Sequence, residues 1–293
     1  MPADYVPATV PEAGRPRWRC GDRLLELARP RIMGIVNVTP DSFSDGGRFF
    51  DGAAGLAQAR RLIEEGADIL DIGGESTRPG APAVEADEEL RRVLPLIEAL
   101  RGAGVPLSID TSKPVVMRAA LAAGACIVND VNALRAPGAV EAVADSDCGV
   151  VLMHMQGTPR TMQAAPHYDD VVAEVGAYLR ARCGALQAAG VAAERIVVDP
   201  GFGFGKTSAH NWALLARLGE LDVGGMPVLA GASRKSMLGH VTGRAVTERL
   251  AASVAAALVA VQRGASIVRV HDVAATRDAL AVWQAIRDHE GGQ

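Results

Sequence analysis

The 293-residue chain is poor in aromatic residues, which make up 4% of it, although 49% of its residues are hydrophobic. Its core must therefore consist mainly of Ala, Val, Leu and Ile, as is typical of an α/β protein with buried parallel strands. The four cysteines are scattered, and none lies in a C-x-x-C pair. This spacing argues against a zinc ribbon or a disulfide framework and favours a reducing compartment, so we expect a cytoplasmic protein.

The chain also lacks a basic excess, a long apolar run and an export signal. Its net charge is -4 and its charges are interspersed, which disfavours a nucleic-acid surface or a basic membrane-binding face. No uncharged apolar run reaches about 18 residues, so we expect no membrane span. The start has neither a basic nor an apolar segment of the kind that makes a secretory signal. Its proline content predicts a disordered tail over residues 1–16 and one domain over residues 17–293.

The stretch Ala67–Gly80 (ADILDIGGESTRPG) shows the pattern that the rest of the chain repeats. Its apolar run is too short for a helix and is typical of a buried strand. Asp71 lies near the end of this run, and a Gly-Gly pair and a polar loop follow. A buried carboxylate is costly unless it is paired. We therefore expect Asp71 to have a partner or a ligand.

The same order of apolar strand, polar residue, loop and helix occurs eight times. We predict strands at 31–38, 69–72, 105–109, 126–128, 149–153, 196–198, 227–230 and 266–270. Helices are predicted at 53–65, 85–100 (interrupted near its end by Pro95), 168–189, 246–263 and 273–288, with another beginning at Pro114. Eight such units in about 250 residues favour a single (β/α)8 TIM barrel. The alternative, an open doubly wound sheet, would need a glycine-rich nucleotide motif after its first strand, and none is present.

The active site of such a barrel lies at the carboxyl ends of its strands. The polar residues expected to surround this mouth are Asn37, Asp71, Asp110, Asn129, His154, Asp199, Lys235 and His271. A carboxylate offers two acceptors side by side, which suit a flat ligand edge with two N–H donors, such as that of a 2-amino-4-oxopyrimidine. One such acid alone is equally well explained by a helix cap or a salt bridge. Because each unpaired buried charge costs several kcal/mol, several of them at one mouth favour a ligand.

Three further features near this mouth favour ring and phosphate binding. Arg269 and His271 lie two positions apart at the end of a strand, so both side chains can face the mouth. The guanidinium of Arg269 can stack on a ring and can form paired hydrogen bonds to a phosphate. It could instead pair with an acid on a helix. Lys235 lies just past the seventh strand, where a barrel often places phosphate contacts, although it could be a solvated lysine. The run Gly201–Thr207 fails the P-loop pattern because Pro200 replaces its first glycine. It is better explained as a turn in which the backbone passes close to a ligand.

The loop after the first strand is rich in oxygen ligands, with Asn37, Thr39, Asp41 and Asp45. Magnesium binds a few such ligands at a time and shares the phosphates of a substrate. We therefore expect Mg²⁺ here, although these residues also suit a surface turn.

The loop after the second strand carries Thr77 and Arg78, whose hydroxyl and guanidinium groups can bind phosphate. Phe43 and Pro79 are apolar residues at the tips of the two loops. They could close over a second, flat substrate.

Eight motifs, in the same order, closely resemble those of the dihydropteroate synthase family and span nearly all of the chain from Arg31 on. They are NVTPDSFSDGG (37–47), DIGGESTRPG (71–80), IDTSKP (109–114), VNDVN (128–132), LMHMQGTP (152–159), DPGFGFGK (199–206), GASRKSMLG (231–239) and RVHD (269–272). The resemblance implies a folate-pathway transferase with a pterin-binding barrel. It would join 4-aminobenzoate to (7,8-dihydropterin-6-yl)methyl diphosphate and release pyrophosphate and 7,8-dihydropteroate.

The resemblance also implies roles for individual residues. The pterin and its diphosphate would be bound by Asp110, Asn129, Met153, Asp199, Phe204, Gly231, Lys235, Arg269 and His271. The aminobenzoate pocket, where sulfonamides bind in the family, would be lined by Phe43, Thr77, Pro79 and Ser236. Asn37 would ligate Mg²⁺, and Asp45, Thr77, Arg78 and Lys235 would act in catalysis. A homodimer is implied by the resemblance alone.

The chemistry of an arylamine fits this assignment. Loss of pyrophosphate would leave a pterin methylene cation, which a weak amine nucleophile can attack once it is held in line. No Ser or Cys has an adjacent base, so no covalent intermediate is expected. Two alternatives are a pterin-binding methyltransferase, which has no diphosphate to hold, and an inactive pterin-binding paralogue, which should have a broken loop motif. No motif is broken here, which favours the synthase.

Overall fold

The structure is a computed structural model that describes residues 16–38, 52–76, 80–158 and 161–290. Eight parallel strands form one sheet in the order β8-β7-β6-β5-β4-β3-β10-β9. They are β3 (Arg31–Asn37), β4 (Ile69–Gly73), β5 (Leu107–Asp110), β6 (Ile127–Asp130), β7 (Gly149–Met153), β8 (Ile196–Asp199), β9 (Leu229–Ala230) and β10 (Ile267–Val270). A bridge between Val198 and Val228 joins the two edges of this sheet. The predicted (β/α)8 barrel is therefore confirmed.

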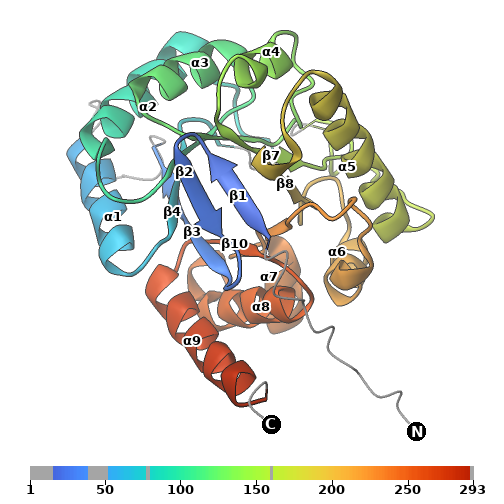
Figure 1. Ribbon diagram of the computed structural model, residues 1–293. Helices are drawn as coiled ribbons and strands as arrows, with labels where there is room; N and C mark the ends of the chain where they lie inside the picture. Colours follow the sequence, from blue (N-terminus) through green and yellow to red (C-terminus); the bar gives the residue numbers. More distant parts are fainter. Residues whose placement is uncertain (1–15, 39–51, 77–79, 159–160, 291–293) are drawn as a thin grey trace, which may run out of the picture.

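Helices surround the sheet on its outside (Figure 1). They are α1 (Gly52–Glu64), α2 (Ala86–Leu100), α3 (Pro114–Ala123), α4 (Ala139–Ala144), α5 (Val171–Ala188), α6 (Ser208–Ala216), α7 (Ser236–Thr242), α8 (Leu250–Gln262) and α9 (Val273–Glu290). The sequence did not predict α4, α6 or α7, which are the shortest of these helices. Short 3-10 turns lie at Ala193–Arg195, Leu218–Glu220 and Val246–Glu248.

One predicted helix interruption and two predicted helix boundaries were wrong. Pro95 lies inside α2 without ending it, because the loss of one N–H is offset by the buried Val93, Leu96 and Ile97 around it. Helix α5 begins at Val171 rather than at residue 168, because the side chain of Asp170 caps the backbone N–H groups of Val172 and Ala173. The helix predicted over 246–263 is a 3-10 turn followed by α8.

The barrel interior is built in layers, because alternate residues of each strand face inward. The layer near the strand starts is apolar and contains Met33, Ile69, Ile127, Val151, Val197, Leu229 and Ile267. Two residues further along six of these strands lie Asp71, Asn129, Met153, Asp199, Gly231 and Arg269. Strand parity thus places a largely polar layer directly above an apolar one.

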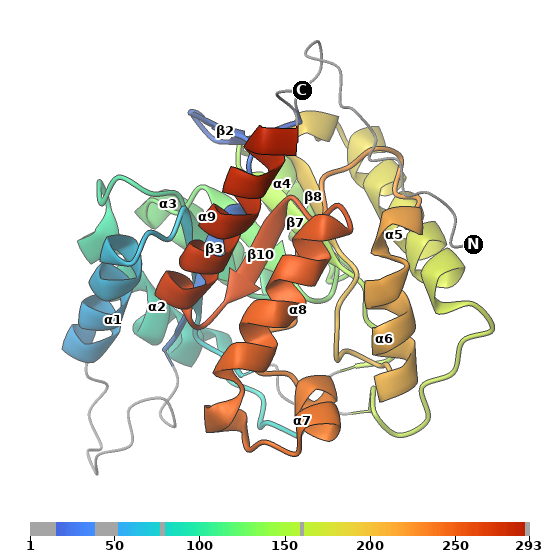
Figure 2. The same ribbon diagram turned by 90° about the horizontal axis from the view of Figure 1, so that it is seen from below.

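An antiparallel hairpin of β1 (Arg17–Cys20) and β2 (Arg23–Glu26) covers the end of the barrel opposite to the strand ends (Figures 1 and 2). Trp18 and Cys20 are fully buried against the apolar layer, and Trp18 Nε1 donates to the carbonyl of Arg195 over 2.9 Å. The sequence did not predict this hairpin. Most of the predicted tail, residues 1–15, lies outside the described residues.

Among the described residues, no helix combines the length and the apolar character that crossing a membrane requires.

Candidate active site

Three predicted site residues and Gly73 lie on one rung across four adjacent strands. Asn37 of β3 pairs with Gly73 of β4, Gly73 with Asp110 of β5, and Asp110 with Asn129 of β6. A Cβ built at Gly73 would lie 3.8 Å from Asp110 Oδ2 and 3.9 Å from Asn37 Oδ1. The structure therefore brings the side chains of Asn37 and Asp110 to the same place at the carboxyl ends of the strands.

Arg269 lies on β10, the strand next to β3, and contacts acids on β4 and β5. Its Nε donates to Asp71 Oδ2 over 2.6 Å, and its Nη2 donates to Asp110 Oδ2 over 2.7 Å. Burial disfavours the cation, but the carboxylates of Asp71 and Asp110 outweigh this effect and raise the pKa of Arg269. Its partners are thus two strand acids rather than a helix acid.

Asp71 has the partners that the sequence analysis required of it. Its side chain is fully buried, and its Oδ2 accepts from Asn129 Nδ2 over 3.0 Å as well as from Arg269. Three predicted mouth residues, Asp71, Asp110 and Asn129, thus form one hydrogen-bonded group with Arg269.

Asp110 and Asp199 are two carboxyl groups at the mouth whose pKa is raised by burial. Burial raises the pKa of Asp110 to about 7, against the lowering effect of Arg269. Burial also raises the pKa of Asp199, whose Oδ1 accepts from the backbone N–H of Gly201 over 2.7 Å. A raised pKa at two neighbouring carboxyl groups is typical of a functional site.

Gly231 lies between the side chains of Asp199 and Arg269. A Cβ built there would lie 3.8 Å from Asp199 Oδ2 and 3.8 Å from Arg269 Cβ. The absence of a side chain at Gly231 therefore keeps the space between these two residues open to a ligand.

Lys235 is held beside this space at the start of α7. Its Nζ donates to the carbonyl of Phe202 and lies 4.2 Å from the centre of the Phe204 ring. Burial lowers the pKa of Lys235 to about 8, although Asp199 opposes this. The residue is therefore not the solvated lysine that was the alternative explanation.

An apolar wall lies next to the polar groups. Phe204 packs against a buried cluster of Val131, Met153, Met155 and Met162. A few polar groups beside an apolar surface are typical of a site for a flat heterocycle.

His271 and Ser233 form a second polar group at the mouth. Ser233 Oγ lies 3.0 Å from His271 Nδ1, and the backbone N–H of His271 donates to the same oxygen. Ser236 is the exposed first residue of α7. Arg234, which follows Ser233 in the sequence, forms an ion pair with Asp272 over 2.6 Å and so has a structural partner.

Asn37, the residue predicted to ligate Mg²⁺, lies within the described part of the chain. No group of three His, Cys, Asp or Glu side chains suited to a metal occurs within the described ranges. One amide oxygen nevertheless suits magnesium, because this ion takes few protein ligands, keeps its waters and shares substrate phosphates. Five predicted site residues lie outside the described residues: Phe43, Asp45, Thr77, Arg78 and Pro79. Their roles stay predictions.

The prediction that His154 faces the mouth was wrong. Its ring packs edge-on against Tyr178, with ring centres 4.9 Å apart, and lies 6.0 Å from that of Tyr168. Burial, with a contribution from Lys206, lowers the pKa of His154 to about 3. His154 therefore turns towards the tyrosine rings around α5 instead of the polar layer.

The glycine run serves backbone packing. A Cβ at Gly201 would lie 2.0 Å from the carbonyl oxygen of His154, and one at Gly205 would lie 2.6 Å from that of Gln156. Both glycines have positive φ, 69° and 59°. The loop after β8 thus packs on the loop after β7, which accounts for the glycines without a direct contact to a ligand.

Two lysines that stabilise the loops were not predicted from the sequence. Lys206 Nζ donates to the carbonyls of Gly201 (2.9 Å) and Phe204 (3.0 Å), and lies 2.9 Å from His154 Nδ1. Lys113 Nζ lies 2.5 Å from both Glu75 and Glu89, and Glu75 in turn accepts from the backbone N–H of Val84. A compositional signal exists: of 30 basic residues only three are lysines, and these are Lys113, Lys206 and Lys235.

Comparisons with known proteins give consistent results. The family model described as "Pterin binding enzyme" matches residues 33–271. A dihydropteroate synthase of Neisseria meningitidis serogroup B is 55% identical over 276 residues, which cover 92% of this chain and 97% of the relative. A Xanthomonas albilineans dihydropteroate synthase solved with 4-aminobenzoic acid has a TM-score of 0.88 and 60% identity, covering 93% of this chain and 98% of its own. A Burkholderia cenocepacia dihydropteroate synthase complexed with 7,8-dihydropteroate has a TM-score of 0.88 and 57% identity, covering 95% and 99%.

Proposed function

This chain belongs to the pterin-binding enzyme family, and we propose that within it the chain acts as a dihydropteroate synthase. It joins 4-aminobenzoate to (7,8-dihydropterin-6-yl)methyl diphosphate, giving 7,8-dihydropteroate and pyrophosphate. The observation that carries the proposal is the convergence of Asp110, Asn129 and Asp199 with Arg269 and Lys235 at one end of the barrel. The relatives solved with 4-aminobenzoic acid and with 7,8-dihydropteroate support it.

The pterin ring is held by acceptors and by a cation. Asp199 and Asp110 accept from its N–H donors, and ionisation of a buried carboxyl becomes easier once donors bind it. Lys235 donates to the ring oxygen or nitrogen, and the Phe204 and Met153 side chains cover the ring. The guanidinium of Arg269 stacks on the ring.

The diphosphate lies towards Arg269 and His271. Both groups supply N–H donors whose positive charge or polarity favours the departing pyrophosphate. We propose that Asn37 binds Mg²⁺ together with this group. When bound, the ion neutralises charge on the leaving group.

Departure of pyrophosphate leaves a pterin methylene cation, which the amine of 4-aminobenzoate attacks, and the nitrogen then loses a proton to pyrophosphate or water. Ser236 and, from the sequence, Phe43, Thr77 and Pro79 line the pocket for this second substrate. The same pocket accepts sulfonamides, which compete with 4-aminobenzoate. Exclusion of water matters because water would convert the cation into an alcohol. Asp45 and Arg78 are proposed to act with Thr77 and Lys235 in the chemical step.

Turnover tests this proposal. Purified protein is incubated with the dihydropterin diphosphate, 4-aminobenzoate and Mg²⁺, and both pyrophosphate and 7,8-dihydropteroate are quantified. Equal amounts of the two products are expected, with much less when a chelator removes the metal and recovery when Mg²⁺ is restored. Absence of 7,8-dihydropteroate would contradict the proposal. Binding of pterin without any product would instead favour a methyltransferase or an inactive paralogue.

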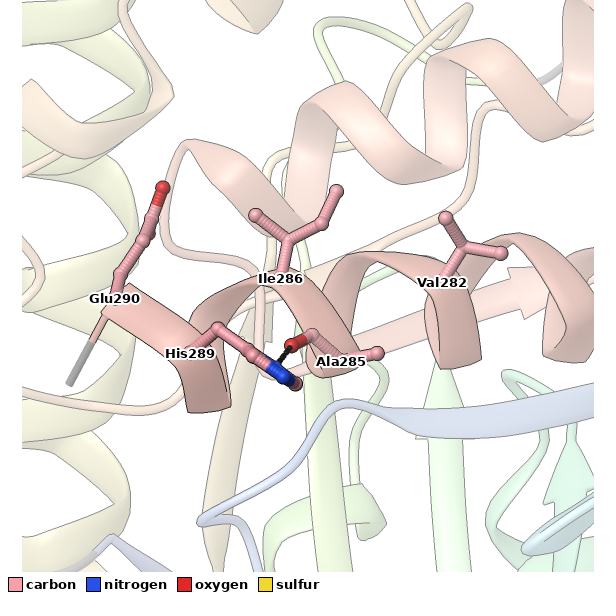
Figure 3. Close-up of a pocket in the computed structure, with 5 residues that line it drawn as sticks. All are labelled: Val282, Ala285, Ile286, His289 and Glu290. Atoms are coloured by element: carbon pink, nitrogen blue, oxygen red, sulfur yellow. Dashed lines mark hydrogen bonds between the residues drawn. The ribbon is translucent and has the colours of Figure 1, made fainter. Parts of the chain in front are cut away.

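A homodimer and a cytoplasmic location are further proposals. Apolar side chains are exposed along α8 and α9, with Val259 37%, Val282 64% and Ile286 54% exposed. Val282 and Ile286 lie one turn apart on α9 and line a shallow pocket there (Figure 3). A second subunit covering this face would remove it from water. Sedimentation of the purified protein tests the dimer.

All four cysteines are free thiols, which supports a reducing compartment.

A further inference from the structure

We infer that Asp71 is a positioning residue for pterin recognition: it fixes the amide of Asn129 so that Oδ1 faces the ligand, and it anchors the guanidinium of Arg269. The inference deepens the proposed function and rests on it. Asp71 is fully buried, so it acts through these two side chains rather than on the substrate.

A single carboxylate oxygen makes both contacts. Asp71 Oδ2 accepts from Asn129 Nδ2, 58 positions away in the sequence, over 3.0 Å. It also accepts from Arg269 Nε, 198 positions away, over 2.6 Å. Asp71 Oδ1 is buried and accepts no hydrogen bond within the described part of the chain. Asp71 therefore orients both residues through its Oδ2 atom.

The contact decides which end of the Asn129 amide the ligand meets. An amide carries an acceptor on one side and two N–H donors on the other, and its terminal torsion is broad and nearly two-fold. Rotation by half a turn would place Asn129 Oδ1 against the Asp71 carboxylate, which repels it. Asp71 thus keeps Oδ1 directed away from itself as an acceptor, beside Asp110 on the same rung. The site therefore selects ligands with N–H donors at this edge.

The contact also fixes the plane of Arg269. Its Nε is bonded to Asp71 and its Nη2 to Asp110, and two bonds to different strands define the orientation of a planar guanidinium. Without Asp71 only the bond to Asp110 remains, and the plane can turn. Stacking on a ring depends on that plane, so loosening it weakens every flat ligand alike.

These two effects can be separated with two ligands. The probes are 6-hydroxymethylpterin and 6-hydroxymethyllumazine, which carries an oxygen in place of the 2-amino group, and their affinities are measured by titration calorimetry. We expect wild-type protein to prefer the pterin. In Asp71→Ala this preference should fall by about tenfold or more, equivalent to about 1.4 kcal/mol. In Asp71→Asn the amide oxygen can still accept from both partners, so the preference should stay within about twofold while both affinities fall.

The control variants distinguish positioning from general damage. Ser108 is the neighbour of Asp71 on β5, is fully buried, and its Oγ has no hydrogen-bond partner in the described residues. Ser108→Ala should therefore leave both affinities within about twofold of the wild type. In an Asn129→Ala background, Asp71→Ala should no longer change the preference, because its effect passes through that amide. Asp71→Leu, which fills the same space, replaces Asp71→Ala if the latter does not fold.

Two results would overturn the inference. One is a folded Asp71→Ala or Asp71→Leu protein that keeps the wild-type preference, and the other is an equal loss of preference with and without Asn129. Failure of the proposed function would look different, because the wild-type protein itself would then bind neither probe or give no product.

Discussion

Arg269 donates through Nη2 to Oδ2 of Asp110 over 2.7 Å, although the two residues lie 159 positions apart in the sequence. This bond connects the last strand of the barrel with its third predicted strand. It places a fixed cation beside a carboxyl group whose pKa burial raises to about 7. The chemistry proposed for the site depends on this arrangement.

Arg269→Lys should weaken binding of the dihydropterin diphosphate by at least about tenfold, or about 1.4 kcal/mol. A lysine ammonium cannot bond Asp71 and Asp110 as a planar fork, and it cannot stack on a ring. Calorimetric titration measures the change. The control is Arg31→Lys, because Arg31 pairs with Asp68 at the other end of the barrel and should not affect this affinity. Equal affinity in wild type and Arg269→Lys would contradict the assignment.

Asp199→Ala should abolish detectable pterin binding, since it removes the acceptor pair beside Lys235. Equilibrium titration with 6-hydroxymethylpterin tests this. Asp169→Ala, at a fully exposed carboxylate, serves as the control and should bind as the wild type does. An affinity of the Asp199 variant within about twofold of the wild type, about 0.4 kcal/mol, would show that the pocket is misplaced.

Arg78→Ala should spare pterin binding and lower turnover. This prediction rests on the sequence alone, because Arg78 lies outside the described residues. Its guanidinium is expected to act on phosphate or on the second substrate rather than on the ring. Binding and steady-state rates are measured on the same preparation. A loss of pterin affinity comparable with the loss of rate would speak against this role.

Lys206 should make the stability of the protein depend on pH between about 7 and 10. Burial lowers its pKa from 10.5 to about 7. Between these values the unfolded chain holds a proton that the folded chain releases, so this contribution to stability is present above 10.5 and is lost as the pH falls through 7. The unfolding free energy of the wild type minus that of Lys206→Met should therefore rise between pH 7 and 10 by at least about 1.4 kcal/mol, the value of one pKa unit. Denaturant unfolding at several pH values measures this difference. A difference that stays constant or falls with pH would contradict the conclusion that burial lowers the pKa of Lys206.

Lys113→Met should destabilise the fold by about 3 kcal/mol, because it leaves the carboxylate of Glu89 buried without its cation. Glu89 is fully buried, and its other oxygen has no partner in the described residues. Glu75→Gln is the matched control. Glu75 is 24% exposed and contacts the same lysine, so its loss should cost much less. Similar unfolding midpoints for Lys113→Met and the wild type would contradict the dependence on this pair.

The sequence predicted the barrel and most of its polar mouth for a physical reason. Buried parallel strands are continuous apolar runs, and a polar residue such as Asp110 or Asp199 at the end of such a run stands out. Strand parity then determines which residues share a face, which is why Arg269 was placed correctly. The family motifs added the roles that residue chemistry alone left open.

Other features depend on contacts that a linear pattern does not contain. The hairpin of β1 and β2 consists of two strands of only four residues each, and the burial of Trp18 between them and the barrel is a tertiary effect. His154 was misplaced because its backbone lies at a strand end while its side chain turns to Tyr178. Lys113 and Lys206 were missed because their partners are distant acids and backbone carbonyls.

The measurement that tests the account most directly is a crystal structure of the protein with the dihydropterin diphosphate. We expect the ring between Asp110, Asn129 and Asp199, with its N–H edge on their oxygen atoms, its face on Arg269 and its diphosphate towards His271. A ring bound elsewhere, or bound at the mouth with its donor edge turned away from all three side chains, would contradict the account.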